Sequence, residues 1–247
     1  MDTGCIWKFK DESSFNDYTL LIPSVAVGNV GQLACDLIIS SLNMLNVGSV
    51  YSPAQIPVIG YDPYNLKSSN LSMSCEIYKC QAKKICVLQI RSPLVFKYAK
   101  TFLGEVVSTF IEKKIKDMVI LTSSFAHEKK HILSSPFRYM TNEENVYVNN
   151  IKAANLVKHD SDNGEVQIFG GGFASLLYKI SVENNLPCLI LYKYCSEGDN
   201  IPDAYDMVKC LTNIIPIFKD EEDLLTQLKQ PVSWTLLFGR PPPQDIY

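Results

Sequence analysis

The chain has 247 residues, of which 47% are hydrophobic and 20% are charged, so it can bury a substantial core. Its formal net charge of -3, with basic runs no longer than pairs such as Lys83-Lys84, excludes the clustered positive charge that nucleic-acid binding needs. The N-terminus does not resemble a signal peptide, and no run reaches the roughly 18 apolar residues of a membrane span. We therefore expect a cytoplasmic and nuclear protein that binds neither nucleic acid nor membranes.

The first elements predict a strand that turns into a helix. Residues 18–25 form an apolar run, and the turn Gly28-Asn29 follows it. Apolar residues then recur over 30–45 at the i, i+3, i+4, i+7 spacing of a helix. Asn29 is placed to cap this helix, and Gln32 to reach back to it in a capping box.

In the middle of the chain, the residue pattern predicts strands before and after a second helix. Short strands are expected at 48–51 and 55–59, a polar loop at 61–70, a hairpin pair at 71–78 and 84–91, a helix at 98–116 and a buried strand at 118–122. A helix that leads into an apolar strand indicates crossover connections. We therefore expect an α/β fold with a mainly parallel, mixed sheet flanked by helices.

The remaining chain completes a single α/β domain over residues 1–239. A loosely structured insertion with weak helical content is expected at 123–164. The stretch 166–215 then predicts a βαβα unit, with a glycine cluster after its first strand and a charged loop after its second. A short helix at 221–230 precedes an extended tail at 240–247, whose three consecutive prolines favour polyproline II.

The sequence contains one literal zinc-protease pattern, His127-Glu128-x-x-His131. Both variable positions are lysines, which oppose a bound cation, and the stretch before Pro136 is short for an active-site helix. The eight cysteines are scattered without a C-x-x-C pair and are expected to be reduced thiols. We interpret the histidine pattern as a chance match, and expect neither a metal nor a cofactor.

Two groups of turn residues invite a ligand-binding interpretation. The cluster Gly170-Gly171-Gly172 lies at an expected strand-to-helix turn, where helix N-termini attract anions. A dinucleotide fingerprint is incomplete, because Ser175 stands where Gly or Ala is needed, so we favour turns that allow close packing or positive φ. A small anion at this cluster remains an alternative. The structural turns expected are Gly28, Asn29, Gly31, Gly170, Gly171 and Gly172.

The loop after the second strand of this unit is acidic. It contains Glu197, Asp199, Asn200, Pro202 and Asp203. Asn200 is placed to cap the next helix, Pro202 fits its first turn and Asp203 is stabilised by the helix dipole. We interpret these residues as groups that cap the helix, and the loop they form can also serve as a docking surface. The sequence contains no recognisable catalytic triad.

Several segments resemble the proteasome assembly chaperone family in order, from about residue 18 to 239. They are Leu20-Leu21-Ile22-Pro23-Ser24-Val25-Ala26-Val27-Gly28-Asn29-Val30-Gly31-Gln32-Leu33-Ala34, Arg91-Ser92, Ser135-Pro136-Phe137-Arg138-Tyr139, Gly170-Gly171-Gly172, the Ser196 to Ala204 loop and Ser233-Trp234-x-Leu236-Leu237-Phe238-Gly239. The resemblance implies a nucleoside-phosphorylase-like fold and a non-catalytic role. It implies a heterodimer with proteasome assembly chaperone 1 that scaffolds the 20S proteasome α-subunit ring and prevents its mis-association.

The resemblance also gives the C-terminal tail a role. Related chaperones carry a hydrophobic-tyrosine-any-residue tail that enters pockets between α-subunits, and this chain ends in Asp245-Ile246-Tyr247, with tyrosine last. The three residues are therefore expected to contact the α-ring. The competing interpretation is a nucleoside- or phosphate-binding enzyme related to nucleoside phosphorylases.

Overall fold

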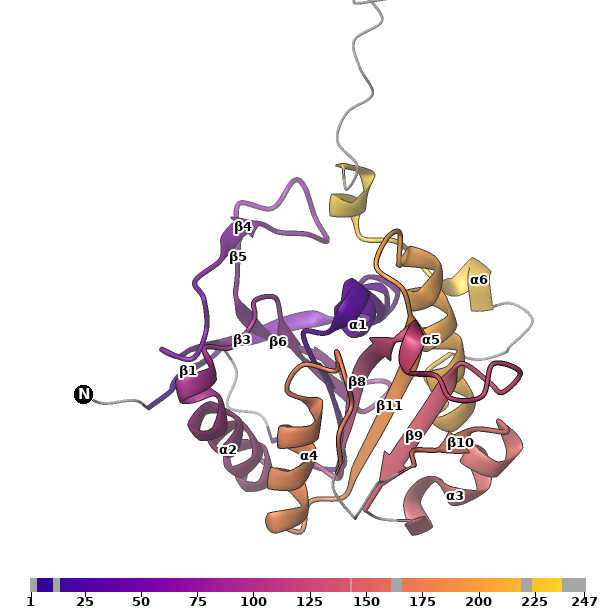
Figure 1. Cartoon of the computed structure of the whole chain (residues 1–247). Coiled ribbons are helices and arrows are strands. Elements are labelled where there is room, and N and C mark those ends of the chain that lie inside the picture. The colour runs from indigo at the N-terminus through magenta and orange to yellow at the C-terminus, as the bar shows by residue number, and fades with distance from the viewer. Residues whose placement is uncertain (1–3, 11–13, 143, 161–165, 219–223, 237–247) are drawn as a thin grey trace, which may run out of the picture.

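The computed structural model describes residues 4–10, 14–142, 144–160, 166–218 and 224–236. These residues form a nine-stranded mixed sheet in the order β1-β3-β6-β7-β2-β8-β11-β9-β10, with a separate two-stranded ribbon, β4-β5 (Figure 1). The strands are β1 Ile6–Phe9, β2 Thr19–Pro23, β3 Leu45–Tyr51, β4 Ile59–Tyr61, β5 Leu71–Met73, β6 Cys75–Cys80, β7 Ile85–Ile90, β8 Asp117–Phe125, β9 Phe137–Thr141, β10 Val157–Lys158 and β11 Cys188–Cys195. The predicted α/β class with a mixed sheet is confirmed.

Four parallel strands, β7, β2, β8 and β11, form the centre of the sheet. Every residue of β2 and of β7 is buried, which explains why these segments are almost continuously apolar rather than alternating. The pairings of β1, β3, β6 and β7 on one side are antiparallel, as is the pairing of β9 with β11 on the other. Because β7, β2, β8 and β11 are parallel, their carboxyl ends lie at the same edge of the sheet, and the loops that follow them meet there.

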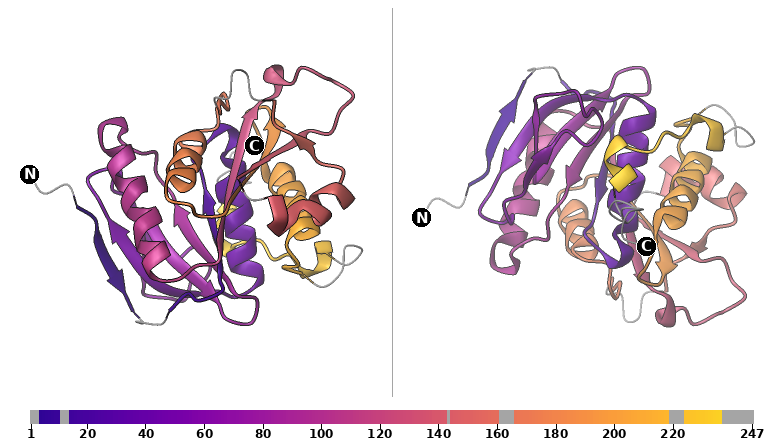
Figure 2. Two further views of the ribbon diagram at one scale, coloured as in Figure 1. Left: turned by 90° about the horizontal axis from the view of Figure 1, so that it is seen from below. Right: turned by 90° about the horizontal axis from the view of Figure 1, so that it is seen from above.

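Helices cover both faces of this centre (Figure 2). Helix α1 (Val30–Ser41) packs against α5 (Ile201–Ile214) on one face, and α2 (Phe96–Glu112) packs against α4 (Ala174–Glu183) on the other. Alternate strand residues supply the two cores: Leu20 and Ile22 point to the α2–α4 layer, and Leu21 to the α1–α5 layer. The strands that the sequence predicted at 18–25, 84–91 and 118–122 all lie in this centre.

Two local predictions about the N-terminal half are wrong. Asn29 does precede α1, but it has a left-handed backbone (φ 51°) and its side chain makes no capping hydrogen bond. The strand expected at 55–59 is mostly loop, and the strand there begins at Ile59. At 55–58 the local strand signal is overridden because the chain leaves the main sheet there to form the β4–β5 ribbon.

The segment 123–164 is more regular than the loosely structured insertion that the sequence predicts. Strand β8 continues to Phe125, and β9, α3 (Glu144–Ala153) and β10 follow. Strand β9 pairs with β11 and β10 pairs with β9, so the segment extends the main sheet. Strand β9 alternates polar and apolar side chains, and its burial alternates as well, so it contains no continuous apolar run that would predict a strand.

The predicted βαβα unit lacks its first strand. Residues 166–169 form no strand, although the Phe169 carbonyl accepts hydrogen bonds from Phe125 N (3.4 Å) and Ser124 Oγ (2.8 Å). The following helix, strand and second helix are present as α4, β11 and α5. The residue before the glycine cluster is therefore held against the end of β8 by isolated backbone and side-chain hydrogen bonds rather than by a sheet ladder.

The C-terminal elements are short. Helix α6 spans Leu224–Gln227, within the helix predicted at 221–230, and a 3-10 turn spans Val232–Leu236. The predicted tail at 240–247, including Asp245, Ile246 and Tyr247, lies outside the described residues. All eight cysteines are free thiols, as predicted. Among the described residues, no helix combines the length and the apolar character that crossing a membrane requires.

Candidate functional site

Three loops from distant parts of the chain meet at the carboxyl ends of β2, β8 and β11. They are the turn that leads into α1, the glycine cluster before α4 and the acidic loop before α5. They surround an open cleft of about 620 Å³, lined by Val25, Ala26, Val27, Gly28, Asn29, Phe125, Gly170, Gly172, Glu197, Gly198 and Asn200. The sequence singled out residues in all three loops, and the structure brings them to the edge where open α/β sheets bind ligands.

Hydroxyl groups at the strand ends hold the glycine cluster in place. Ser24 Oγ and Thr122 Oγ1 both donate to the Gly171 carbonyl, at 2.8 and 3.0 Å. Ser24 Oγ also accepts from Phe173 N at 2.9 Å. Because these buried hydroxyls already serve the backbone of the loop, they are structural groups and not available nucleophiles.

The turn into α1 is tied to the same cluster. Val27 N donates to the Gly170 carbonyl at 3.0 Å, and the Val27 carbonyl accepts from Ser123 Oγ. A side chain on Gly172 would overlap the Val25 carbonyl, and Gly172 has a positive φ of 62°. Likewise, a side chain on Gly31 would overlap the Leu121 carbonyl. These positions require glycine because backbones approach each other closely there.

The acidic loop is organised by its own side chains, differently from the sequence prediction. Asn200 occupies the N-cap position of α5 but makes no capping bond; its Nδ2 donates to Ser196 O and to Asp203 Oδ2, each at 2.8 Å. Asp199 Oδ1 instead accepts from Ile201 N at 3.1 Å. Pro202 lies in the first turn as expected, and Glu197 and Asp199 are exposed. Asp199, which precedes the N-cap position, therefore supplies the side-chain bond to the first turn that was expected of Asn200.

Sequence reasoning missed Lys193, which anchors this loop. Its ammonium lies 2.8 Å from Asp203 Oδ1 and 2.5 Å from Asp206 Oδ2, and the residue is buried. Burial by itself lowers the pKa of Lys193, but the hydrogen bonds and charges of Asp203 and Asp206 outweigh burial and leave the pKa raised. Asp203 is thus neutralised inside the molecule, while Glu197 belongs to no ion pair among the described residues.

A second, smaller polar cavity of about 80 Å³ lies beside the same strand ends. Arg138 lines it, is buried, and donates to Ser135 O and Phe137 O at 2.6 and 2.8 Å. His159 Nδ1 lies 2.7 Å from the Tyr192 hydroxyl. The sequence placed Arg138 in a family-like segment but did not connect it with His159 and Tyr192, because the three residues come from separate segments.

The zinc-protease pattern does not form a helix. The first histidine lies in a 3-10 turn, Ala126–Glu128, which ends before His131. Within the described part of the chain, no group of three His, Cys, Asp or Glu side chains is placed to hold a metal ion. The two histidines therefore do not present ligands on one helical face, as the motif requires.

The comparisons with known proteins agree over almost the whole chain. A sequence profile described as the PAC2 family matches residues 20–229. A protein from Bos taurus named Proteasome assembly chaperone 2 is 36% identical over 93% of this chain and 94% of its own length. The protein of the same name from Homo sapiens is 35% identical over 93% of this chain and 95% of its length.

Solved structures share the fold at lower sequence identity. The Pyrococcus furiosus protein PbaB, described as an archaeal proteasome activator, superposes with a TM-score of 0.70 at 14% identity, covering 91% of this chain and 94% of that one. Pyrococcus furiosus PbaA, described as an archaeal homolog of proteasome-assembly chaperone, gives a TM-score of 0.68 over 91% of each chain. The profile match and the near-complete alignments show that the chain belongs to the PAC2 family.

Proposed function

We propose that this protein is a non-catalytic proteasome assembly chaperone. The observation that carries the proposal is identity of 32–36% over 92–94% of this chain to vertebrate relatives that all bear that name. The groups beside the cleft support it, because the Ser24 and Thr122 hydroxyls are bonded to the Gly171 carbonyl and Asp203 is paired with Lys193. What remains exposed, notably Glu197, suits contact with another protein.

In finer detail, the chain pairs with proteasome assembly chaperone 1, and the heterodimer holds the 20S α-subunit ring. The acidic loop is one contact, since Asp199 caps α5 and Lys193 fixes Asp203, so the loop keeps its shape when it meets a partner. A preorganised loop loses little conformational entropy on binding. The protein acts in the cytoplasm and nucleus, which microscopy of a fluorescent fusion would check.

The C-terminal tail is the second proposed contact with the α-ring. Ile246 and Tyr247 follow three prolines, which favour an extended chain that delivers an apolar end to a pocket. Deleting residues 245–247 from the full heterodimer is expected to reduce retention of assembled α-ring in a pull-down. The matched control is Gln244→Ala, which keeps the apolar end, and unchanged retention after the deletion would refute the tail contact.

The chaperone proposal as a whole is tested against the enzyme alternative by two assays. Affinity capture of the tagged chain from its native extract is expected to recover α-subunits and the sister chaperone. Calorimetry with inosine and inorganic phosphate is expected to give no saturable heat. Saturable nucleoside binding with no captured α-subunits would reverse the proposal in favour of the enzyme.

A further inference from the structure

Arg138 is a buried cation without a counter-ion in the described part of the chain. It is 5% exposed, and none of the ion pairs among the described residues includes it. A guanidinium stays charged at any pH that proteins experience in cells, so the charge cannot be lost by titration. Burying a cation without an anion is costly. The position therefore favours a bound anion.

Three hydrogen bonds to the neighbouring backbone and loop hold the Arg138 guanidinium in place. Nη1 donates to Ser135 O at 2.6 Å and to Phe137 O at 2.8 Å, and Nη2 donates to Ser134 Oγ at 2.8 Å. These acceptors are neutral, so they fix the group without balancing its charge. Nε makes no hydrogen bond to a described residue, yet it is not among the fully enclosed atoms that lack a partner. A group from outside the chain can therefore reach it.

The small polar cavity beside Arg138 has the size and the donors for one carboxylate group. Its volume of about 80 Å³ is the room of a few water molecules and far less than a nucleoside needs. Tyr192 lies directly opposite Arg138 in the register of β9 and β11. Tyr194 lies on the same face, with its ring centre 5.4 Å from Arg138 Cζ and its hydroxyl 3.4 Å from that of Tyr192. The guanidinium and two hydroxyls thus line one cavity.

The charges around this cavity favour an anion with a single charge. Lys130, Glu128 and Asp160 also line it, and Lys130 and Asp160 are exposed to water, which screens them. A carboxylate balances the one buried charge of Arg138 and can pair with a guanidinium through two parallel hydrogen bonds. A doubly charged phosphate would instead leave one negative charge beside Glu128 and Asp160. The cavity therefore suits a carboxylate better than a phosphate.

The loop that Arg138 holds presents two aliphatic side chains to solvent. Ile132 is 85% exposed, and Leu133 is fully exposed. Ser134 Oγ, which accepts from Arg138, donates in turn to His131 O at 2.7 Å, so the guanidinium braces the loop. Figure 2 shows this connection between β8 and β9, in pink, projecting from the body of the protein. Exposed aliphatic residues beside an arginine are typical of a protein contact rather than of a small-molecule site.

The cavity and the acidic loop lie at the same edge of the sheet, because Ser124 and Tyr194, near the carboxyl ends of β8 and β11, line the cavity. We propose that the Arg138 cavity receives a carboxylate of an α-ring subunit, and that Ile132 and Leu133 contact the apolar residues beside that carboxylate. The inference rests on the proposed function and adds a contact to the acidic loop and the tail. Because the acidic loop and Arg138 carry opposite charges, the two contacts together fix the orientation of the partner.

Nuclear magnetic resonance of the full chain tests the chemistry of the cavity, with acetate as the probe. The Nε–Hε signal of Arg138, assigned by its loss in Arg138→Lys, is expected to shift saturably with sodium acetate and not with sodium chloride at equal ionic strength. Inorganic phosphate is expected to cause no saturable shift, and tighter binding of phosphate than of acetate would overturn the carboxylate assignment.

Carboxylates of the chain itself, Asp162 and Glu165, are the competing occupants of the cavity. The double variant Asp162→Asn/Glu165→Gln removes both charges and is expected to bind acetate as the wild type does. If acetate binds only to this variant, an internal ion pair fills the cavity and the proposal is overturned.

Retention of assembled α-ring by the full heterodimer tests the partner. Arg138→Lys keeps the charge but loses the planar fork, and Leu133→Ser removes an exposed aliphatic group; each is expected to lower retention at least about fivefold. The matched control is Leu225→Ser, which alters a 70% exposed leucine on α6 and should retain the ring as wild type does. Circular dichroism checks that each variant is folded, and Leu133→Ser keeps the test valid if Arg138→Lys loosens the loop.

The outcomes separate this inference from the proposed function. Normal retention by Leu133→Ser and Arg138→Lys overturns the contact at this cavity, while the proposed function stands. No saturable shift with acetate overturns the carboxylate site itself. If the wild-type heterodimer retains no α-ring, the proposed function fails and the α-ring contact fails with it, whatever acetate does.

Discussion

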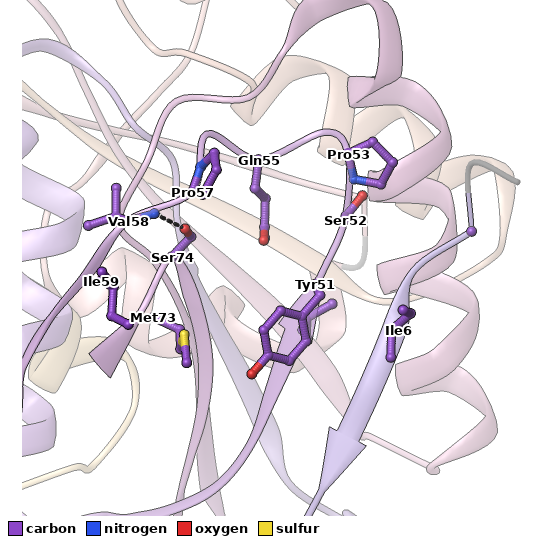
Figure 3. A pocket seen from close by; sticks show the side chains of 12 residues that line it. Ile6, Tyr51, Ser52, Pro53, Gln55, Pro57, Val58, Ile59, Met73 and Ser74 are labelled. Atoms are coloured by element: carbon purple, nitrogen blue, oxygen red, sulfur yellow. Dashed lines mark hydrogen bonds between the residues drawn. The ribbon is translucent and has the colours of Figure 1, made fainter. Parts of the chain in front are cut away.

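The cleft at the strand ends and the groove beside the ribbon differ in how they treat polar groups. Beside the cleft, the Ser24 hydroxyl and the Asp203 carboxylate are bonded within the chain, and Glu197 is the one carboxylate among the lining residues. In the groove beside the ribbon, which Ile6, Gln55, Ile59 and Met73 help to line, no lining residue is charged (Figure 3). Polar side chains beside the cleft are thus satisfied within the chain, whereas the groove is lined by uncharged residues.

Each region is backed by a buried ion network, and the two networks differ in exposure. Behind the ribbon, Arg91 Nη1 lies 3.2 Å from Asp36 Oδ1, and both side chains are largely shielded, at 19% and 11% exposed. Beneath the acidic loop, Lys193 meets Asp206, whose side chain is 58% exposed. The first network should therefore affect stability more than the second, since water screens the second.

The largest expected effect is that of Arg91→Met. The substitution leaves Asp36 buried beside the Tyr64 hydroxyl without its cation, which should cost about 3–5 kcal/mol of unfolding free energy. Urea denaturation measures the change. The double variant Asp36→Leu/Arg91→Met removes the Asp36–Arg91 pair but leaves the buried Glu76, 4.0 Å from Arg91 Nε in the wild type, without a cation, so it should recover only part of the loss. Equal losses in both proteins would show that the Asp36–Arg91 pair is not the cause.

Gly172→Ala tests the close packing of the cleft. The new Cβ would overlap the Val25 carbonyl at a positive φ, so we expect a loss of about 1–3 kcal/mol by thermal or urea unfolding. Gly104→Ala is the matched control, because its Cβ would meet open space within α2, and it should stabilise by about 0.5–1 kcal/mol. Similar effects of the same sign would contradict the steric explanation.

Lys193→Met should cost less than Arg91→Met, about 1–2 kcal/mol, because methionine keeps most of the buried stem and Asp206 remains hydrated. The difference in unfolding free energy between wild type and Lys193→Met should become smaller at high salt, as measured by urea unfolding in about 0.05 and about 1 M sodium chloride. If Lys193→Met lost as much unfolding free energy as Arg91→Met, the prediction that the Arg91 network contributes more to stability would be wrong.

The smallest effect near neutral pH concerns Cys75, which is buried in the sheet behind Gln55. Burial raises the pKa of its thiol from 9.0 to about 12. Because the folded state keeps a proton that the unfolded state loses, the thiol's contribution to stability is complete below pH 9 and falls as pH rises toward 12. Stability measured from pH 8 to 10 should therefore decline less steeply for Cys75→Ala than for wild type; parallel curves would argue against this linkage.

Much of the fold could be predicted because its signals are local. Continuous apolar runs marked the buried parallel strands, and 3.6-residue periodicity marked α1 and α2. The sequence likewise singled out the glycines and the acidic loop, since glycine and capping residues restrict backbone geometry wherever they stand. It could not show that Asp199 rather than Asn200 caps α5, a choice that depends on what each side chain can reach.

The sequence by itself determined the fold class and marked Gly28, Gly170 and Gly172, which have positive φ, because these signals follow from neighbouring residues; Gly31, also expected in a turn, lies within α1. Only the tertiary structure decided that three loops share one cleft, that Lys193 neutralises Asp203, and that Arg91 reaches Asp36 behind the ribbon. Those pairings join residues far apart in the chain. Their strength comes from burial and distance, which exist only once the sheet has brought the segments together.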